Sequence, residues 1–589
     1  MHTFTVWAPD AQRVELDAHL STGVQTAPME RGSDGWWALD VPDAGPGTDY
    51  AFRVDGSDPR PDPRSAWQPS GVDGPSRVFD PSQHTWSDGA WAGRDARGAV
   101  VYELHIGTFT PEGTLDAARG RLDHLVDLGV DVVELMPVAA FPGRWGWGYD
   151  GVDLYAVHDA YGGPAALQAF VDDCHGRGLA VALDCVYNHL GPAGNYLGEF
   201  GPYFTDKHET PWGQAVNLDD AGSEGVRRFV LDNALRWFRD FHVDALRLDA
   251  VHALVDDSPV HLLAQLSTET AALSAELGRP LTLIAESDLN DAAMVTPVGE
   301  PTGSDLPARG MQGQWADDVH HALHALLTGE RQGYYADFGS VDVLAKTLTD
   351  VFFHDGRHSA FRGVDWGAPV DRARYSGHQF VAYTTTHDQV GNRGPGDRLS
   401  ATLDDGQLAT AAAVVLTSAF TPMVFMGEEW GARTPWQFFT DHDPELGKLV
   451  SEGRREEFSD HGWSEDEIPD PQAESTRDDS VLDWSEPASG RGARLLAWTR
   501  DLIALRRAEA DLRDGDLRAV SVDADGEAGW LVVHRGAFDV VVNLAEAAQE
   551  VPAPGLSSGA SVVLAWDDAA AVSTGGVQLP GHSVAVVRR

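Results

Sequence analysis

Four segments of the sequence end a short apolar run with side chains that could do chemistry. In chain order these side chains are Asp184, Arg247, Asp249, Glu286, His387 and Asp388. Acidic side chains are costly to bury unless they are paired or used. A pair of carboxylates suits glycoside hydrolysis, in which one group stays protonated to donate to the leaving oxygen and the other stays ionised to attack the anomeric carbon.

The spacing suggests a task for each carboxylate. Arg247 lies two residues before Asp249, so on a strand both side chains point to the same face, and the guanidinium keeps Asp249 ionised as a nucleophile. Glu286 is expected to be the acid, because neighbouring negative charge raises its pKa. Asp388 could hold sugar hydroxyls and support the charged transition state. Any one of these groups alone could equally be a structural hydrogen-bonder, and only the ordered set argues for a site.

The elements that must position these groups alternate between apolar runs and amphipathic helical segments. This pattern favours an α/β fold, a (β/α)8 TIM barrel with helices outside, over an open sheet. Active sites of such barrels lie at the C-terminal ends of the strands. The expected strands are Val100–Leu104, Val130–Met136, Leu179–Val186, Val243–Leu248, Leu281–Ala285, Gln312–Trp315, Phe380–Thr385 and Pro422–Met426. Expected helices include Leu115–Leu128, Ala165–Arg177, Ser223–Phe241 and Gln407–Ser418.

Two further domains flank the barrel. Residues 1–92 read as short strands separated by Gly, Asp and Pro turns, which predicts an N-terminal β-sandwich. Residues 93–512 form the catalytic barrel, with an excursion at about 190–217 after strand three, which is too long for an ordinary loop. Residues 513–589 return to strands and predict a C-terminal β-sandwich domain, in which the first strand is expected at Leu517–Val522.

Composition excludes several classes of function. A formal net charge of −48 repels phosphate backbones, so we expect no nucleic-acid partner. No stretch is apolar and long enough to span a bilayer, so we expect no membrane partner. The N-terminus carries no basic region followed by an apolar one, which favours a cytoplasmic location. Cys174 and Cys185 are expected to be buried thiols.

The ordered segments Asp184–His189, Ala245–Asp249, Ala285–Ser287 and Thr386–Asp388 resemble the four motifs of the α-amylase superfamily. The resemblance spans the barrel and implies a retaining double displacement. It makes Asp249 the nucleophile, Glu286 the acid/base and Asp388 the transition-state stabiliser. Gly148-Tyr149-Asp150 resembles the segment whose tyrosine stacks on the sugar. Residues implied to line the reacting subsite are Tyr149, His189, Arg247 and His387.

One departure from the superfamily pattern follows Asp249. Many members that act on plain α-glucans have a Lys-His pair there, whereas Val251-His252-Ala253 keeps only His252 as a substrate contact. The acceptor side is therefore expected to differ.

Other segments resemble the trehalose-releasing branch of the superfamily over nearly the whole chain. They include Gln68–Ser76, Ala285–Asp291, Thr386–Arg393, Phe438–His442 and Gly453–Phe458. The resemblance makes the N-terminal domain similar to a carbohydrate-binding module. It also implies cleavage of the α-1,4 bond next to the trehalose end of malto-oligosyl trehalose.

Recognition of the trehalose end is expected from the loops after strands six to eight. The candidate substrate contacts there are Asp317 and Asp318, together with Glu428, Glu429 and the aromatic residues Trp436, Phe438 and Phe439, which could equally be loop core.

The remaining expectations concern cofactors, partners and rival functions. We expect no cofactor, no required metal at His320 and His324 or at Asn188, and a monomer that acts on malto-oligosyl trehalose and related α-glucans. Two alternatives stay open: a glycogen branching or debranching enzyme of the same superfamily, and a non-catalytic glucan-binding protein.

Overall fold

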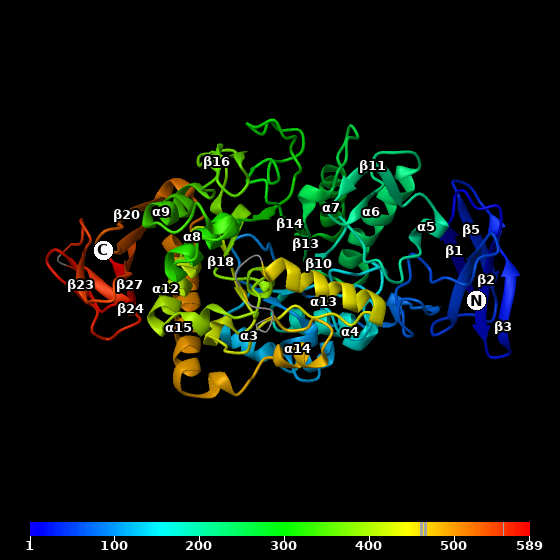
Figure 1. Cartoon of the computed structure of the whole chain (residues 1–589), viewed down its shortest axis with the longest axis horizontal. Coiled ribbons are helices and arrows are strands. Elements are labelled where there is room, and N and C mark those ends of the chain that lie inside the picture. The colour runs from blue at the N-terminus through cyan, green and yellow to red at the C-terminus, as the bar shows by residue number, and fades with distance from the viewer. Residues whose placement is uncertain (460–462, 464–467, 558) are drawn as a thin grey trace.

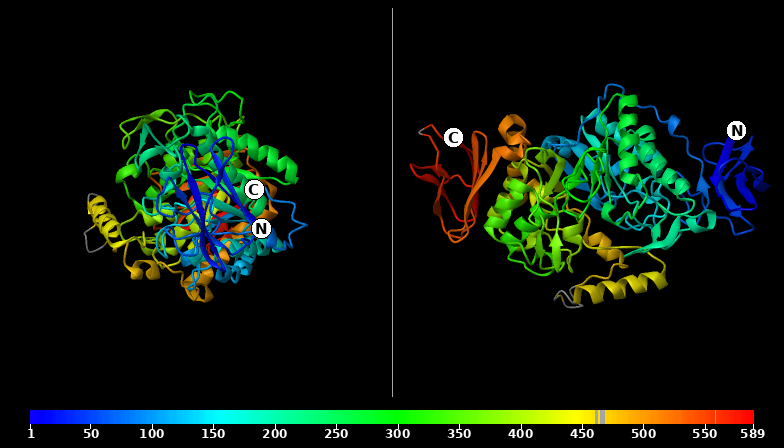
Figure 2. Two further views of the ribbon diagram at one scale, coloured as in Figure 1. Left: turned by 90° about the vertical axis from the view of Figure 1, so that its right-hand side faces the viewer. Right: turned by 90° about the horizontal axis from the view of Figure 1, so that it is seen from above.

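The computed structural model describes residues 1–459, 463, 468–557 and 559–589. The molecule is elongated, with a barrel domain in the middle and a β domain at each end (Figure 1). The N- and C-termini therefore lie at opposite ends of the long axis. Seen from above, helix α13 (Pro444–Ser459) lies on the outside of the barrel domain (Figure 2).

Eight parallel strands close into a barrel in the order β10-β13-β14-β15-β18-β19-β8-β9, which confirms the predicted TIM barrel. Each of the eight predicted apolar runs supplies one strand, including the short sixth one. The strands are β8 (Val101–Leu104), β9 (Val132–Leu135), β10 (Ala180–Cys185), β13 (Ala245–Leu248), β14 (Thr282–Ala285), β15 (Gly313–Trp315), β18 (Phe380–Tyr383) and β19 (Thr421–Phe425).

Helices surround the barrel as predicted, with two differences. The predicted helix Leu115–Leu128 is divided in two, because Gly120 caps the C-terminus of the first piece. Between β14 and β15 the described residues form no helix. The main helices are α2 (Leu115–Arg119), α3 (Leu122–Leu128), α4 (Gly163–Gly176), α6 (Ser223–Asp240), α7 (Leu262–Leu277), α8 (Asp317–Thr328), α9 (Val341–Asp350), α12 (Asp405–Leu416) and α15 (Gly490–Ala508).

Short helices and two hairpins fill the long loops. The hairpin of β11 (Phe204–Thr210) and β12 (Gly213–Val216) lies within the predicted excursion after strand three. A second hairpin, β16 (Arg357–Ser359) and β17 (Val364–Trp366), follows α9. The short helices are α1 (Ile106–Phe109), α5 (Leu197–Phe200), α10 (His387–Gly391), α11 (Leu399–Thr402), α14 (Glu474–Asp479) and α16 (Ala510–Arg513).

The N-terminal domain is built from two antiparallel sheets, ordered β1-β5-β4 and β3-β2-β6-β7. Its apolar residues continue into the main core, with Trp7 against Tyr203 of the barrel domain at 5.5 Å between ring centroids. The strands are β1 (His2–Trp7), β2 (Val14–Leu20), β3 (Gly23–Pro28), β4 (Glu30–Arg31), β5 (Trp36–Val41), β6 (Asp49–Val54) and β7 (Ser76–Arg77).

The C-terminal domain also has two sheets, ordered β20-β21-β22-β27-β24 and β23-β26-β25. The first strand begins later than predicted, because Leu517–Ala519 forms a 3₁₀ turn capped by Asp516. The smaller sheet was not predicted. The strands are β20 (Val520–Asp525), β21 (Trp530–Arg535), β22 (Phe538–Asn543), β23 (Gln549–Pro552), β24 (Ser561–Ala565), β25 (Ala571–Val572), β26 (Gly576–Leu579) and β27 (Ser583–Arg588).

Two smaller predictions can be checked on the described part of the chain. Cys174 and Cys185 are free, buried thiols, as expected. None of the described helices combines the length and the apolar character that crossing a bilayer demands.

The contact between the N-terminal domain and the barrel domain predicts a sensitive glycine. A Cβ on Gly225, in the first turn of α6, would lie 2.1 Å from the Trp7 ring. Gly225→Ala therefore forces the indole away, and we expect it to lower the free energy of unfolding by about 1–3 kcal/mol, measured by chemical denaturation. Gly176→Ala in α4 is the control, because its Cβ would meet nothing within 4 Å. Equal stability of the two variants would contradict the prediction.

Candidate active site

The interior of the barrel changes from apolar to charged along the strands. Side chains two residues apart on a strand point to the same face. On four strands an apolar interior residue is followed, two positions later, by a charged one; the apolar residues are Val101, Val132, Ala182 and Ala245. The strand register places Glu103 beside Glu134 and Asp184 beside Arg247. Four neighbouring strands thus contribute three acids and one arginine to one layer below the C-terminal face.

Arg247 links the carboxylates of this region. It is 1% exposed, and its Nη1 donates to Asp249 Oδ1 at 2.8 Å and to Asp184 Oδ2 at 2.8 Å. Its Nη2 forms an ion pair with Glu286 Oε2 at 3.1 Å. The ring of Trp315 covers the guanidinium, 4.4 Å from its carbon. One buried cation therefore holds three carboxylates from three strands.

Glu286 is held in the form that an acid requires. Burial, with the negative charges of Asp249 and Asp388, raises its pKa to about 8 against the opposing effect of Arg247. Burial is the larger cause of this raised pKa, whereas the prediction from the sequence rested on neighbouring charge alone. The backbone N–H of Ala250 donates to Glu286 Oε2 at 2.6 Å. Ala250 adopts a left-handed conformation (φ 38°), which turns the chain sharply after Asp249.

A relay of hydrogen bonds joins the first strand to the third through His387. Its Nδ1 donates to Glu103 Oε1 at 2.5 Å. Tyr149 donates its hydroxyl hydrogen to Asp184 Oδ2 at 2.6 Å, so it accepts from His387 Nε2 at 2.8 Å. Burial alone would lower the pKa of His387, but Glu103 outweighs it and raises that pKa. An imidazolium that donates from both nitrogens fits these partners.

Burial sets the protonation of the other acids in this layer. It raises the pKa of Glu134 to about 8, helped by Glu103 and Asp184. Neither carboxyl oxygen of Glu134 has a hydrogen-bond partner within the described residues. Burial also raises the pKa of Asp184 to about 6, although Arg247 opposes it. Because Glu134 stays protonated at neutral pH, the layer carries less negative charge than its acid count implies.

Asp388 stands at the start of a short helix above the seventh strand. Thr386 and Gln389 form a capping box that begins α10. Asn392, one turn later, donates to Asp388 Oδ1 at 2.6 Å. Asp388 is partly exposed, and its negative charge contributes to the raised pKa of Glu286.

Two predicted histidines lie nearer the rim. His189 Nε2 donates to the backbone oxygen of Tyr149 at 2.7 Å, and its ring stacks on Trp212 at 4.5 Å between ring centroids. Trp212, at the turn of the β11–β12 hairpin, is 48% exposed. His252 lies in a 3₁₀ turn (Val251–Ala253), and its Nδ1 is 4.0 Å from Asp288 Oδ1. His252 is thus not part of the Arg247 cluster.

A pocket of about 370 Å³ opens beside the residues that follow Glu286. Asp317 and Asp318 both line it. Asp317 accepts from the Tyr383 hydroxyl, and Asp318 Oδ2 accepts from the backbone of Phe353 and His354 and from Asn290. Asp318 therefore fixes the loop that carries Phe353. Other lining residues are Asp288, Tyr334, Phe361, Arg362 and Trp366.

The other suggested recognition residues after strand eight are mostly loop core. Trp436 and Phe439 are fully buried, and Phe438 is partly buried. Glu429 is buried and accepts from Tyr102 and pairs with His124. Glu428 accepts from Thr385 at 2.9 Å. These contacts hold the loops together.

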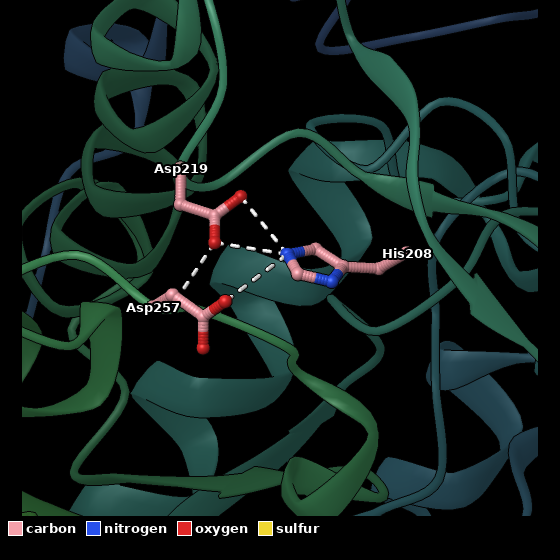
Figure 3. Close-up of side chains that lie close together, drawn as sticks. All are labelled: His208, Asp219 and Asp257. Carbon is pink, nitrogen blue, oxygen red and sulfur yellow. Dashed lines mark hydrogen bonds and ion pairs between the residues drawn. The ribbon is translucent and has the colours of Figure 1, made fainter.

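Among the residues that the structure describes, one group of possible metal ligands lies outside the carboxylate site. His208, Asp219 and Asp257 come together near the β11–β12 hairpin (Figure 3). The ammonium of Lys207 already donates to Asp219 at 2.8 Å, so a metal ion would have to displace it. His320 instead contacts the Thr384 carbonyl and the Tyr335 hydroxyl, and His324 pairs with Glu330.

Sequence reasoning missed Glu103 and Glu134 as members of the site. Each stands within an apolar strand, Val101–Leu104 and Val132–Leu135, where a lone acid is costly. The cost of burying a lone acid was the signal from which the two residues could have been identified. Trp315, the ring over Arg247, carried no comparable signal, because an apolar strand can place a tryptophan in any core.

Comparison with known families assigns a family description to each of three parts of the chain. Residues 75–209 match "Alpha amylase, catalytic domain". Residues 1–69 match "Carbohydrate-binding module 48 (Isoamylase N-terminal domain)". Residues 515–586 match a domain of unknown function, DUF3459.

Individual proteins are similar over almost the full length. The malto-oligosyltrehalose trehalohydrolase of Arthrobacter ramosus is 52% identical over 588 residues, covering 99% of both chains. That of Rhizobium sp. (strain M-11) is 50% identical, covering 99% of this chain and 97% of its own. A putative α-amylase from Salmonella typhimurium has a TM-score of 0.88 at 37% identity, covering 100% and 97%. The chain therefore belongs to the malto-oligosyltrehalose trehalohydrolase family of α-amylase-type glycoside hydrolases.

Proposed function

We propose that the protein hydrolyses the α-1,4-glucosidic bond next to the trehalose end of malto-oligosyl trehalose, releasing trehalose and a malto-oligosaccharide. The observation that carries the proposal is the single guanidinium of Arg247, which holds Asp249 and Glu286 together at the mouth of the barrel. The names of the full-length relatives supply the substrate.

In the proposed first step the carboxylic acid of Glu286 gives its proton to the glycosidic oxygen. An oxygen of Asp249 attacks the anomeric carbon, the bond from that carbon to the glycosidic oxygen breaks, and trehalose leaves. Arg247 Nη1 donates to Asp249 Oδ1 at 2.8 Å and holds this carboxylate in position for the attack. Asp388 faces the positive charge that develops on the sugar.

In the second step Glu286, now a carboxylate, takes a proton from water. The water oxygen attacks the anomeric carbon, the ester to Asp249 breaks, and the sugar is released with its original configuration. Tyr149, held by Asp184 and His387, offers its ring to the sugar at the cleavage point. His189 lies beside the same tyrosine.

The leaving trehalose is proposed to lie in the pocket of about 370 Å³ beyond Glu286. The acid must stand on the side of the leaving group. The pocket adjoins the acid, because Asp288, two residues after Glu286, is one of its lining residues. Two aromatic side chains that line the pocket are exposed, Tyr334 at 39% and Phe361 at 55%. Aromatic faces stack on sugars, and Asp317 and Arg362 can bind hydroxyl groups.

The rival functions lack comparable support. A non-catalytic glucan-binding protein has no use for an acid whose pKa is raised beside a carboxylate paired with arginine. A branching or debranching enzyme would act at α-1,6 bonds, and the full-length relatives bear another name.

Substrate preference tests the proposal. We expect trehalose release from malto-oligosyl trehalose to be much faster than maltose release from a malto-oligosaccharide of equal length, measured as kcat/KM. Phe361→Ala is expected to reduce this preference about tenfold by removing an exposed stacking ring. Phe361→Tyr, which keeps the aromatic ring, is the matched control and should retain the preference. Equal rates on the two wild-type substrates, or better turnover of pullulan, would refute the trehalose-specific reading.

The nucleophile can be tested by a neutral substitution. Asp249→Asn keeps the size of the side chain but removes its negative charge. We expect kcat to fall by about 10⁴-fold or more, because covalent attack needs the carboxylate, while substrate binding measured by calorimetry persists. Asp257→Asn, at an exposed acid on a nearby loop, should retain wild-type kcat. Full activity of Asp249→Asn would remove it from this role.

The raised pKa of Glu286 predicts the alkaline limit of activity. The acid must carry its proton, so kcat/KM should fall as pH rises through its pKa of about 8 rather than near that of an ordinary glutamate. The measurement is a pH profile of kcat/KM. The control is Glu286→Gln, assayed with a substrate whose leaving group needs no proton. Its pH profile should lack the alkaline limb. An alkaline limb already complete by about pH 6 would contradict the assignment.

A further inference from the structure

A second cleft opens at the end of the barrel opposite the carboxylates. It has a volume of about 1280 Å³. Its walls are the segment that leads into β8, the residues just before β9 and β10, and the C-terminal parts of α15 and α16. Asp249, Glu286 and Asp388 follow the C-terminal ends of β13, β14 and β18, at the opposite end of the barrel, so the cleft is not part of the site described above.

The charge of this cleft is opposite to that of the protein. The whole chain has 43 basic residues of the Lys and Arg type against 91 acidic ones. The cleft is lined by six arginines and only two acids, Asp95 and Asp131. The arginines are Arg94, Arg97, Arg177, Arg506, Arg507 and Arg513. A local excess of cations in a protein with net charge −48 requires a physical reason.

The acids at hand do not neutralise these arginines. Asp131 is shared, because it accepts from Arg94 and from Arg507, each at 2.9 Å. Asp95 pairs with Arg97 alone. Arg177 turns to Asp123 and Asp173, which lie outside the lining. Even with those two acids counted, six guanidinium groups face four carboxylates.

Two of the six have no carboxylate partner in the described structure. Arg513 is exposed, and no hydrogen bond or ion pair of its side chain is found among the described residues. Arg506 is 2% exposed and donates only to backbone oxygens, those of Leu416, Ser418, Phe420 and Leu512. Its Nε is buried without a partner in that part of the chain.

The buried guanidinium of Arg506 is electrostatically unfavourable as it stands. Burial, aided by the nearby charge of Arg535, lowers the pKa of Arg506 to about 9. Arg535 also donates only to backbone oxygens. A bound anion would offset this repulsion, since buried charges are normally paired.

We propose that this arginine cleft binds the phosphoryl group of a small phosphorylated molecule. Planar guanidinium groups match phosphoryl oxygens in bidentate pairs, and several of them around one cleft suit a dianion better than a single carboxylate. A polyanionic chain is disfavoured because the protein as a whole carries a formal net charge of −48. The ligand is thus a compact molecule, whose source is inorganic phosphate or a phosphorylated sugar.

Calorimetry on the full chain distinguishes the two sources. The probes are inorganic phosphate, pyrophosphate, glucose 6-phosphate and uncharged glucose, at constant ionic strength set with potassium chloride. Pyrophosphate is expected to bind, and glucose is not. Glucose 6-phosphate that binds more tightly than inorganic phosphate indicates a sugar phosphate, and the reverse order indicates the free ion. Absence of binding by every phosphorylated probe up to about 10 mM overturns the proposal.

Substitutions place the ligand in the cleft. Arg513→Gln removes no hydrogen bond or ion pair found among the described residues, and it should weaken pyrophosphate binding about tenfold, since a charge-assisted contact is lost. Arg507→Gln should act in the same direction. Arg500→Gln, at an exposed arginine of α15 outside the lining, is the matched control. All three variants should hydrolyse substrate at the wild-type rate.

Two results would count against the cleft itself. Pyrophosphate binding that is unchanged in Arg513→Gln and in Arg507→Gln would place the ion elsewhere. Pyrophosphate that competes with the glucan substrate in steady-state kinetics would place it at the catalytic end of the barrel.

Discussion

The active end of this barrel depends on one buried cation. Arg247 is 1% exposed and forms contacts of 2.8–3.1 Å with Asp184, Asp249 and Glu286. Removing the guanidinium would leave the carboxyl groups of these three residues close together without their cation, which is strongly destabilising. The strand ends that carry these acids are therefore tied to one another by one side chain. Catalytic geometry and local stability rest here on a single side chain.

The buried acids around this cation are each neutralised in a different way. Glu103 is balanced by His387, and Asp184 by Arg247 and Tyr149. Glu134 has no such partner, and its raised pKa keeps it neutral at ordinary pH. A layer with this many acids can be buried because a cation, an imidazolium and a bound proton each offset one of them. Glu286 remains the acid that is both protonated and open to substrate.

The two ends of the barrel have contrasting electrostatics. The C-terminal face gathers carboxylates around one arginine, whereas the N-terminal face gathers arginines around few carboxylates. The acidic surface suits a neutral glucan, which needs no charge to approach. The arginine cleft is proposed to hold a compact anion at the end of the barrel away from the carboxylates, where a charged ligand would not compete with a neutral substrate.

The barrel and its eight strands could be predicted from the sequence, and so could the positions of Asp249, Glu286 and Asp388 at strand ends, because apolar runs of β length and acids that follow them are local signals. The sequence also placed Arg247 beside Asp249, since two residues on one strand share a face. The contacts between residues that are distant in the sequence depend on the tertiary structure. Glu103 and His387 are 284 residues apart in the chain and meet only through barrel closure. The pocket of Tyr334 and Phe361, and the cleft of Arg94 and Arg507, likewise join loops whose proximity no local pattern encodes, because it depends on how distant strands pair.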